Sequence, residues 1–319
     1  MKIVTIGGGT GNSTILKGLK KITNDITTIV TVADDGGGSG VLRKDLGILP
    51  PGDIRACLLA LANVEPAMKR LMDYRFQEGI LKGQSFGNLF IAAMVDIYGD
   101  FDKAIKETGN VLAITGKVLP MTLDDVTLYA EMEDGSIIKG ESNIGELTKD
   151  YPVSIRRVYL KPDGSKPVQE AVDEILNTDI VLIGPGSLYT SIMPNLLIED
   201  IARALKATKA KIYYICNIMT QNGETSGYSV FDHVSSINRH LGFKIIDKII
   251  VNKEEIPEDV LRKYDSVPVY LNDEDMTKLK EYEIVELNCY KNLKGKVRHD
   301  YKEIGRFLLE DFQSEYIGN

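Results

Sequence analysis

Short apolar runs rich in β-branched residues alternate with longer helical patterns along the chain. Runs at 3–6, 27–33, 180–183, 212–215 and 245–251 predict buried strands, while the spacing of apolar residues at 13–21, 54–72 and 88–98 predicts helices. Strands that alternate with helices are typical of a mostly parallel, doubly wound α/β sheet. This is the fold class that we predict.

One stretch, from about 115 to 160, breaks this rhythm. Apolar and polar residues alternate over 126–132, an acidic turn follows at Glu133-Asp134-Gly135, and extended patterns resume at 136–139 and 153–160. An Asp-Gly pair between alternating runs indicates a β-hairpin. We therefore predict a small antiparallel β insertion in a single domain spanning residues 1–319, because no linker, repeat or low-complexity tract divides the chain.

Composition and charge narrow the classes of function. Of the 319 residues, 43% are hydrophobic and 26% are charged, as in globular proteins. The net charge of −8 argues against a general nucleic-acid or anionic-membrane surface. No apolar run reaches the ~20 residues of a membrane span, the first residues reach glycine before a signal-peptide core could form, and three dispersed cysteines build no disulfide framework. We expect a cytoplasmic protein, with a homodimer as one option for its assembly.

Eight of the 29 glycines fall in two loops, and the first of these opens the first helix. In this turn, GGGTGN at 7–12, backbone amides can approach a phosphate while the helix N-terminus adds partial positive charge. The spacing matches neither the GxGxxG dinucleotide fingerprint nor a Walker A loop. We predict phosphate or nucleotide binding by Gly8, Gly9, Thr10, Gly11 and Asn12, with a tight turn that binds nothing as the alternative.

The second glycine-rich loop, ADDGGGSG at 33–40, ends the second predicted strand. Asp34 lies 23 residues beyond Gly11, close to where a nucleotide-binding fold places a ribose-binding acid. Asp34 and Asp35 could instead hold Mg²⁺ that bridges phosphates. Gly37 and Ser39 would then belong to a second backbone cradle or a mobile lid, and a solvated acidic turn is the plain alternative.

Three further loops follow predicted strands or open helices. In PPGDIR at 50–55, Asp53 is a candidate helix cap, and Arg55 is poorly placed for the helix dipole, which indicates a ligand or a carboxylate partner. The loops at 184–191 and 216–225 lie where open α/β sheets bind ligands. In the leading hypothesis the first would cradle a diphosphate, whereas the neutral amides and hydroxyls of the second suit base or sugar binding. The candidates there are Gly186, Ser187, Thr190, Asn217, Thr220 and Gln221.

The histidines offer less. His233 and His240 lie seven residues apart on one predicted helix face, which indicates packing more than a metal site. In the sharper triplet Arg298-His299-Asp300, the arginine is a candidate phosphate ligand and Asp300 could orient His299. A surface charge cluster is the alternative.

Six motifs occur in order over almost the whole chain. They are GGGTGNS at the start, ADDGGGSG, PPGDIR, GQSFGNL at 83–89, GPGSLYTSIMPNLL at 184–197 and CNIMTQNGETSGYSVFDHV at 216–234. Together they resemble the YvcK-type gluconeogenesis factors of the YvcK/CofD-like family. The resemblance implies a Rossmann-like α/β fold and a cytoplasmic factor that supports growth and cell shape on gluconeogenic carbon sources.

The same resemblance implies binding of UDP-sugars such as UDP-N-acetylglucosamine. In that branch a tyrosine and an arginine near the C-terminal end are tied to sugar-nucleotide binding. By motif they correspond to Tyr264 and Arg298. A tyrosine that stacks on uracil and an arginine that pairs with the diphosphate are physically sensible roles.

The related CofD branch comprises Mg²⁺-dependent transferases that join 2-phospholactate to a deazaflavin from a nucleotide-activated donor. It shares the glycine-rich start, the acids after the second strand and a GPG turn, whereas ADDGGGSG and CNIMTQNGET resemble the regulatory branch. The leading hypothesis is therefore a UDP-sugar-binding regulatory factor with no assigned catalytic residue and no certain cofactor. A transferase with Mg²⁺ on Asp35, and with Asp53 as a second candidate ligand, is one alternative. An NAD-like dinucleotide binder is the other.

Overall fold

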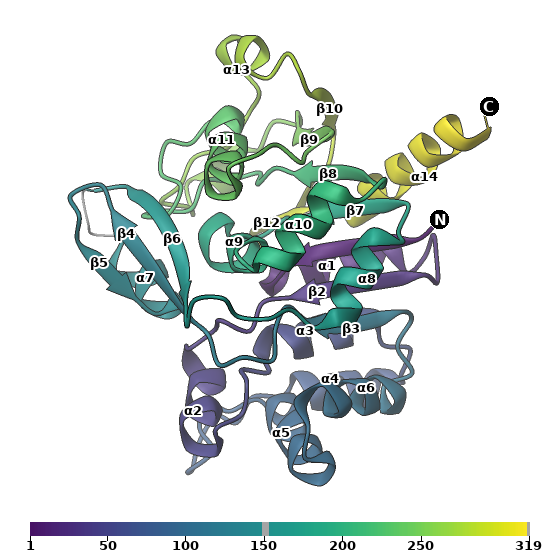
Figure 1. The fold of residues 1–319 in the computed structure, drawn as a ribbon, viewed down its shortest axis with the longest axis vertical. Helices are drawn as coiled ribbons and strands as arrows, with labels where there is room; N and C mark the ends of the chain where they lie inside the picture. Colours follow the sequence, from purple (N-terminus) through teal and green to yellow (C-terminus); the bar gives the residue numbers. More distant parts are fainter. Residues whose placement is uncertain (149–152, 318–319) are drawn as a thin grey trace.

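A seven-stranded parallel sheet forms the centre of the computed structural model, which describes residues 1–148 and 153–317 (Figure 1). Its strands are β1 Ile3–Gly7, β2 Ile26–Val30, β3 Lys117–Pro120, β7 Ile180–Ile183, β8 Lys211–Ile215, β9 Lys248–Asn252 and β10 Glu283–Leu287. They lie in the order β10-β9-β8-β7-β1-β2-β3, and every neighbouring pair is parallel. The predicted doubly wound α/β fold is confirmed.

Two groups of helices cover the sheet. One group is α1 Gly9–Leu19, α3 Gly52–Leu61 and α14 Tyr301–Ile317, and the other is α8 Gln169–Leu176, α9 Met193–Leu196 and α10 Glu199–Ala207. Because the chain leaves β1 and β7 in opposite directions along the sheet, right-handed crossovers place the two groups on opposite faces. All residues of β1, β2, β7 and β9 are buried, as expected for a parallel sheet covered on both sides.

The remaining helices lie around this central sandwich. They are α2 Gly37–Leu46, α4 Pro66–Asp73, α5 Phe86–Tyr98, α6 Phe101–Val111, α7 Glu141–Leu147, α11 Val230–Leu241, α12 Glu258–Leu261, α13 Asp273–Lys278 and the short π-helix at Leu188–Ile192. None of the helices in the described part of the chain combines the length and the apolar character that crossing a bilayer requires.

A separate three-stranded antiparallel sheet confirms the predicted insertion, with shifted bounds. It consists of β4 Thr127–Met132, β5 Ile137–Lys139 and β6 Ile155–Lys161, in the order β5-β4-β6, and α7 follows β5. The Asp-Gly turn is confirmed, since Gly135 has φ 84° between the paired strands β4 and β5. The insertion begins only after β3, which pairs with β2 in the main sheet. Residues 149–152 of the predicted insertion lie outside the described residues.

Other boundaries differ for simple reasons. The second strand ends at Val30, not at 33, because its partner β1 ends at Gly7 and no further ladder pair exists. The helical pattern at 54–72 is two helices, with Pro66 opening the second. The exposed edge strand β10 and the hairpin of β11 Tyr290–Leu293 and β12 Lys296–His299 were not predicted, because they lack a long apolar run.

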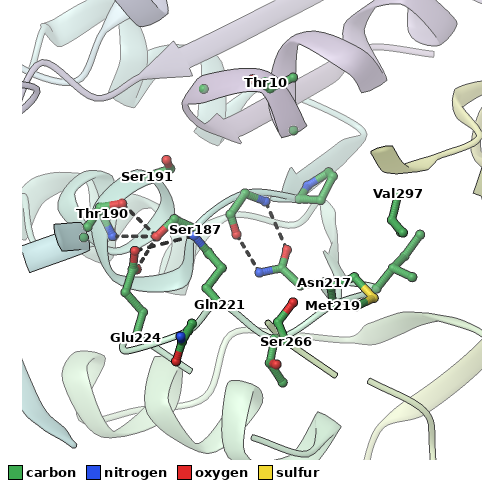
Figure 2. A pocket seen from close by; sticks show the side chains of 18 of the residues that line it. Thr10, Ser187, Thr190, Ser191, Asn217, Met219, Gln221, Glu224, Ser266 and Val297 are labelled. Carbon is green, nitrogen blue, oxygen red and sulfur yellow. Dashed lines mark hydrogen bonds between the residues drawn. The ribbon is translucent and has the colours of Figure 1, made fainter. Parts of the chain in front are cut away.

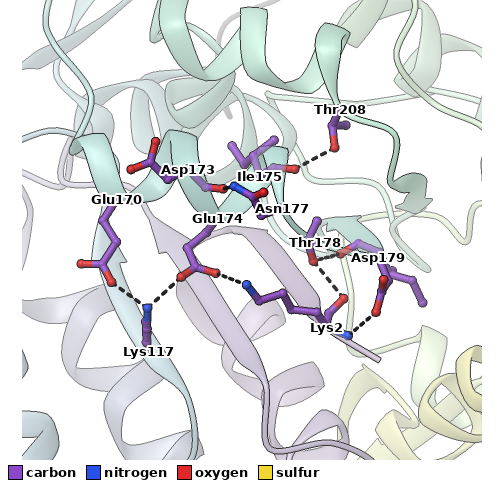
Figure 3. Close-up of polar contacts among 11 residues, drawn as sticks. Lys2, Lys117, Glu170, Asp173, Glu174, Ile175, Asn177, Thr178, Asp179 and Thr208 are labelled. Carbon is purple, nitrogen blue, oxygen red and sulfur yellow. Dashed lines mark hydrogen bonds and ion pairs between the residues drawn. The ribbon is translucent and has the colours of Figure 1, made fainter.

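Ion pairs tie the amino ends of the strands together. Figure 3 shows Lys117 at the start of β3 donating to Glu174 of α8 at 2.7 Å, and Lys2 before β1 pairs with the other oxygen of Glu174 at 3.4 Å. These contacts hold α8 across β1 and β3 at one end of the sheet. The polar loops gather at the opposite, carboxyl end.

Candidate functional site

A cavity of about 640 Å³ opens at the carboxyl ends of β1, β7 and β8 (Figure 2). The chain leaves β1 and β7 in opposite directions here, so the cavity lies at the switch point where α/β sheets bind ligands. Twelve of the seventeen residues selected from the sequence line it: Gly8, Gly9, Thr10, Gly11, Gly186, Ser187, Thr190, Asn217, Thr220, Gln221, Tyr264 and Arg298.

The first glycine loop forms the opening turn of α1, with Gly8 as the N-cap residue and no side chain capping the turn. A Cβ on Gly11 would lie 2.3 Å from the carbonyl oxygen of Pro185, so only glycine lets this turn approach the loop after β7. The amino end of an eleven-residue helix therefore faces the cavity, where its partial positive charge favours an anion.

The loop after β7 is organised by Ser187. Its hydroxyl accepts from the Thr190 amide and the Thr190 hydroxyl, at 3.2 and 2.7 Å, and donates to the Glu224 carboxylate, as Figure 2 shows. Glu224 is buried, and burial raises the pKa of its carboxyl while the Ser187 hydrogen bond opposes the rise. Ser187 thus links the loop after β7 to the loop after β8.

Asn217 holds the same two loops together. Its side-chain amide accepts from the Gly186 N–H at 3.3 Å and donates to the Gly186 carbonyl at 2.8 Å. Both polar ends of the side chain are thereby engaged, which gives Asn217 a loop-positioning role in this structure.

Thr220 and Gln221 are neighbours in the loop after β8, but they differ in whether their polar side-chain atoms have hydrogen-bond partners. Thr220 exchanges hydrogen bonds with the backbone of Val267 at 2.8 and 3.0 Å. The side-chain oxygen of Gln221 is buried at the cavity wall without a hydrogen-bond partner. A buried acceptor without a partner is costly, so Gln221 is suited to a donor on a ligand.

Tyr264 and Arg298 both line the cavity, and both are hydrogen-bonded to the backbone of Val297. The Tyr264 hydroxyl accepts from the Val297 N–H, and its ring packs against a small apolar cluster that includes Val260. The half-buried Arg298 donates to the Val297 carbonyl at 2.8 Å, and it is the only lysine or arginine among the described residues of the cavity wall.

The expectation that Asp300 orients His299 is wrong. His299 donates to the Cys216 carbonyl at 3.0 Å, and burial lowers the pKa of its imidazole to about 4, so the ring is neutral at pH 7. Asp300 accepts instead from Lys291 and from the Lys302 N–H near the start of α14. His299 therefore packs between β12 and the loop after β8.

The two other histidines and Arg55 have structural partners. His233 and His240 bond to backbone carbonyls four residues earlier on α11, and the described residues contain no group of three His, Cys, Asp or Glu side chains suited to a metal. Arg55 donates to the Asp73 carboxylate at 3.1 Å. Of the two alternatives predicted for Arg55, a ligand or a carboxylate partner, the structure shows the carboxylate partner.

Five of the selected residues lie outside the cavity wall: Asn12, Asp34, Asp35, Gly37 and Ser39. The buried Asn12 donates to the Thr28 hydroxyl at 2.9 Å, beneath the glycine loop. Asp35 accepts from the Ser142 N–H and hydroxyl at 2.9 and 2.7 Å. The second glycine-rich loop thus supports the insertion, and it begins α2 at Gly37.

A group of half-buried acids adjoins the glycine loop, and sequence reasoning missed one of them, Glu141. Burial, with Asp34 nearby, raises the pKa of Asp53 to about 6, while the Gly9 amide opposes the rise. Burial and the charges of Asp34 and Asp53 raise the pKa of Glu141 to about 8. Glu141 reaches the cavity because the insertion packs α7 against the loop after β7, and no local sequence pattern predicts this contact. Glu224, which also lines the cavity, lies in the motif at 216–234 but was not selected from the sequence.

Comparison with known proteins identifies the family to which the chain belongs. The chain matches the family model described as 2-phospho-L-lactate transferase CofD over residues 3–290, so it is a CofD-family protein built on a Rossmann-like sheet. It is 51% identical over 99% of its length to a putative gluconeogenesis factor of Clostridium acetobutylicum, of which it covers 70%. It is 48% identical to the gluconeogenesis factor of Bacillus subtilis, with 97% of each chain covered.

A crystal structure of a Bacillus halodurans protein has a TM-score of 0.92 and 43% identity, and the match covers 97% of this chain and 99% of that one. With near-complete coverage at this identity, the chain belongs to the gluconeogenesis factor family. The family resemblance seen in the sequence motifs is confirmed.

Proposed function

We propose that this protein is a cytoplasmic regulatory factor that binds a UDP-sugar such as UDP-N-acetylglucosamine, and that it serves cell shape and growth on gluconeogenic carbon sources. The observation that carries the proposal is the convergence of twelve sequence-selected residues on one cavity at the switch point. Membership of the gluconeogenesis factor family supports the biological context.

The cavity wall divides into parts that suit the parts of such a ligand. The first turn of α1 and the loop at Ser187 offer backbone amides to phosphate oxygens. The unpartnered oxygen of Gln221 accepts from a sugar hydroxyl or a base N–H. Arg298 supplies the cation of the cavity wall, and the neighbouring Tyr264 ring offers a surface for the base.

Calorimetric titration with UDP-N-acetylglucosamine tests this proposal. We expect saturable binding that weakens by about 1.5–3 kcal/mol in Arg298→Ala, the usual worth of a hydrogen bond to a charged group. Arg203→Ala, an exposed change on α10, is the control and should bind as the native protein does. The absence of binding heat, or equal loss in both variants, would refute the proposal.

A second candidate function is a CofD-like transferase, which the half-buried pair Asp34 and Asp53 favours. Two neighbouring carboxylates whose pKa values are raised by burial gain from a divalent cation, and Mg²⁺ commonly uses one or two carboxylates with water. Asp35 fits this role poorly, because Ser142 already occupies one of its oxygens. Any Mg²⁺ would be held by Asp34 and Asp53, where it would neutralise phosphate charge.

One assay separates these candidates. Turnover of a nucleotide-activated phospholactate donor with Mg²⁺ would favour the transferase, whereas binding of the UDP-sugar without turnover would favour the regulatory factor. Competition between NAD and the UDP-sugar tests the dinucleotide alternative in the same titration.

A further inference from the structure

A second cleft, of about 570 Å³, shares Tyr264 and Arg298 with the main cavity. We call it the lysine cleft, and its lining is Lys263, Tyr264, Lys294, Gly295, Lys296 and Arg298. Four of these six residues are cations, on a chain whose net charge is −8. The ion pairs formed by the described residues include none of the four, although nearby Arg262 and Lys291 each pair with an acid.

The fold brings these cations together from two segments. Along β12, Lys296 and Arg298 lie two residues apart and share one face, while Val297 and His299 between and after them are buried. The bond from the Val297 N–H to the Tyr264 hydroxyl fastens the segment that carries Lys263 onto β12. This contact therefore holds the two segments that carry the cations side by side.

Lys294 is placed there against its local preference. Leu293 of β11 pairs with Lys296 of β12, which leaves a two-residue turn in which Lys294 has φ 54° and Gly295 has φ 79°. Turns of this kind favour Asn-Gly, and a positive φ is uncommon for lysine. A lysine at this position carries a conformational cost and adds a fourth positive charge to the cleft.

The main cavity offers few positive side chains to a phosphorylated ligand. Its lining contains three acids, Glu141, Glu224 and Asp265, against Arg298 as the one cation of its described wall. We propose that the lysine cleft is a phosphate-binding subsite that takes a phosphate-rich group at the mouth of the main cavity. This inference rests on the proposed function only in taking the main cavity as the seat of the nucleotide.

Inorganic pyrophosphate is the probe that tests the subsite on the full-length protein. The cleft variant is Lys294→Asn with Lys296→Gln, in which asparagine suits the turn and both charges are removed. The matched control is Lys209→Gln with Lys211→Gln, two exposed lysines at the amino end of β8. We expect the pyrophosphate Kd to rise about fivefold or more in the cleft variant and less than about twofold in the control.

An unchanged melting temperature in the cleft variant shows that the loss is not unfolding. The inference is overturned if the native protein binds no pyrophosphate, or if both double variants weaken binding equally. Lysine-dependent pyrophosphate binding without any UDP-N-acetylglucosamine binding would support the subsite and reject the proposed UDP-sugar function.

Competition then identifies the source of the phosphate. If pyrophosphate displaces UDP-N-acetylglucosamine from the native protein, and does so more weakly in the cleft variant, the lysine cleft takes part in binding the nucleotide's own diphosphate. If both bind at once, the cleft takes the phosphate of a separate molecule. Either result supports the subsite.

Discussion

Glu141 shows at the residue scale how burial changes the chemistry of the main cavity. Burial and nearby Asp34 and Asp53 raise the pKa of its carboxyl from 4.5 to about 8, so the group is protonated in the folded protein at neutral pH. A protonated carboxyl does not repel a phosphate and can donate a hydrogen bond to it. An acid at the wall of an anion site is therefore compatible with the ligand that we propose.

The raised pKa predicts how stability depends on pH. The folded state holds this proton more tightly than the unfolded state, so its contribution is complete below pH 4.5 and is lost as the pH rises toward about 8. Between pH 6 and pH 8 we expect the free energy of unfolding of the native protein to fall by about 1–2 kcal/mol more than that of Glu141→Gln. Urea unfolding at both pH values measures the difference, with Glu146→Gln on the same helix as the control. Identical pH profiles for native protein and Glu141→Gln would contradict the prediction.

At the scale of elements, one carboxylate joins two distant segments. Asp35 follows β2, and its carboxylate accepts from the N–H and hydroxyl of Ser142 in the first turn of α7, 107 residues later. Asp35 therefore acts as a helix cap supplied from outside the helix, and it fixes the insertion that carries Glu141 to the main cavity.

This contact predicts a coupled loss of stability. Asp35→Ala should cost about 1–2 kcal/mol, and Ser142→Ala should cost less, because only one of the two hydrogen bonds is lost. Since both changes remove the same interaction, the double variant should be less destabilised than the sum of the single variants. Urea unfolding of the four proteins completes the cycle, and strict additivity would show that the contact contributes nothing.

At the scale of the whole molecule, the C-terminal helix joins the two ends of the chain. Helix α14 packs against α1, whose amino end faces the main cavity, and its Asp311 pairs with the buried Lys248 of β9 at 2.8 Å. The Tyr213 hydroxyl of β8 donates to the same carboxylate. In Figure 1, α14 runs out to the C-terminus at the right of the view.

Removing this acid should destabilise the folded protein. In Asp311→Ala the buried Lys248 ammonium keeps its ion pair with Glu283 at 3.2 Å but loses the Asp311 carboxylate that it shares with the Tyr213 hydroxyl, so we expect about 2 kcal/mol of destabilisation. Glu310→Ala, its exposed neighbour on α14, should change stability by less than about 0.5 kcal/mol. Calorimetric melting compares the two variants. Similar melting temperatures would mean that α14 is not held by the Asp311 contact.

The local pattern of the sequence was sufficient for the five central parallel strands and for most of the cavity wall, but not for the edge strands β3 and β10. Strands such as Ile180–Ile183 are short apolar runs, and a parallel sheet buries such runs on both faces, so their identity is written in the residues themselves. The glycine turn at 7–12 and the loops at 184–191 and 216–225 follow strands, and the carboxyl ends of parallel strands necessarily meet at one edge of the sheet.

The tertiary structure decided which side chains remain free to act. In the folded protein Asn12 donates to Thr28, Asn217 is bonded to Gly186, and Asp35 accepts from Ser142 of the insertion. These partners are far apart in sequence, so only the packing of the chain decides that they meet. It also brought Glu141 to the main cavity and assembled the lysine cleft from two segments. The sequence by itself determined the central strands and the family, whereas burial and long-range contacts determined which side chains line the cavity and which of them remain accessible.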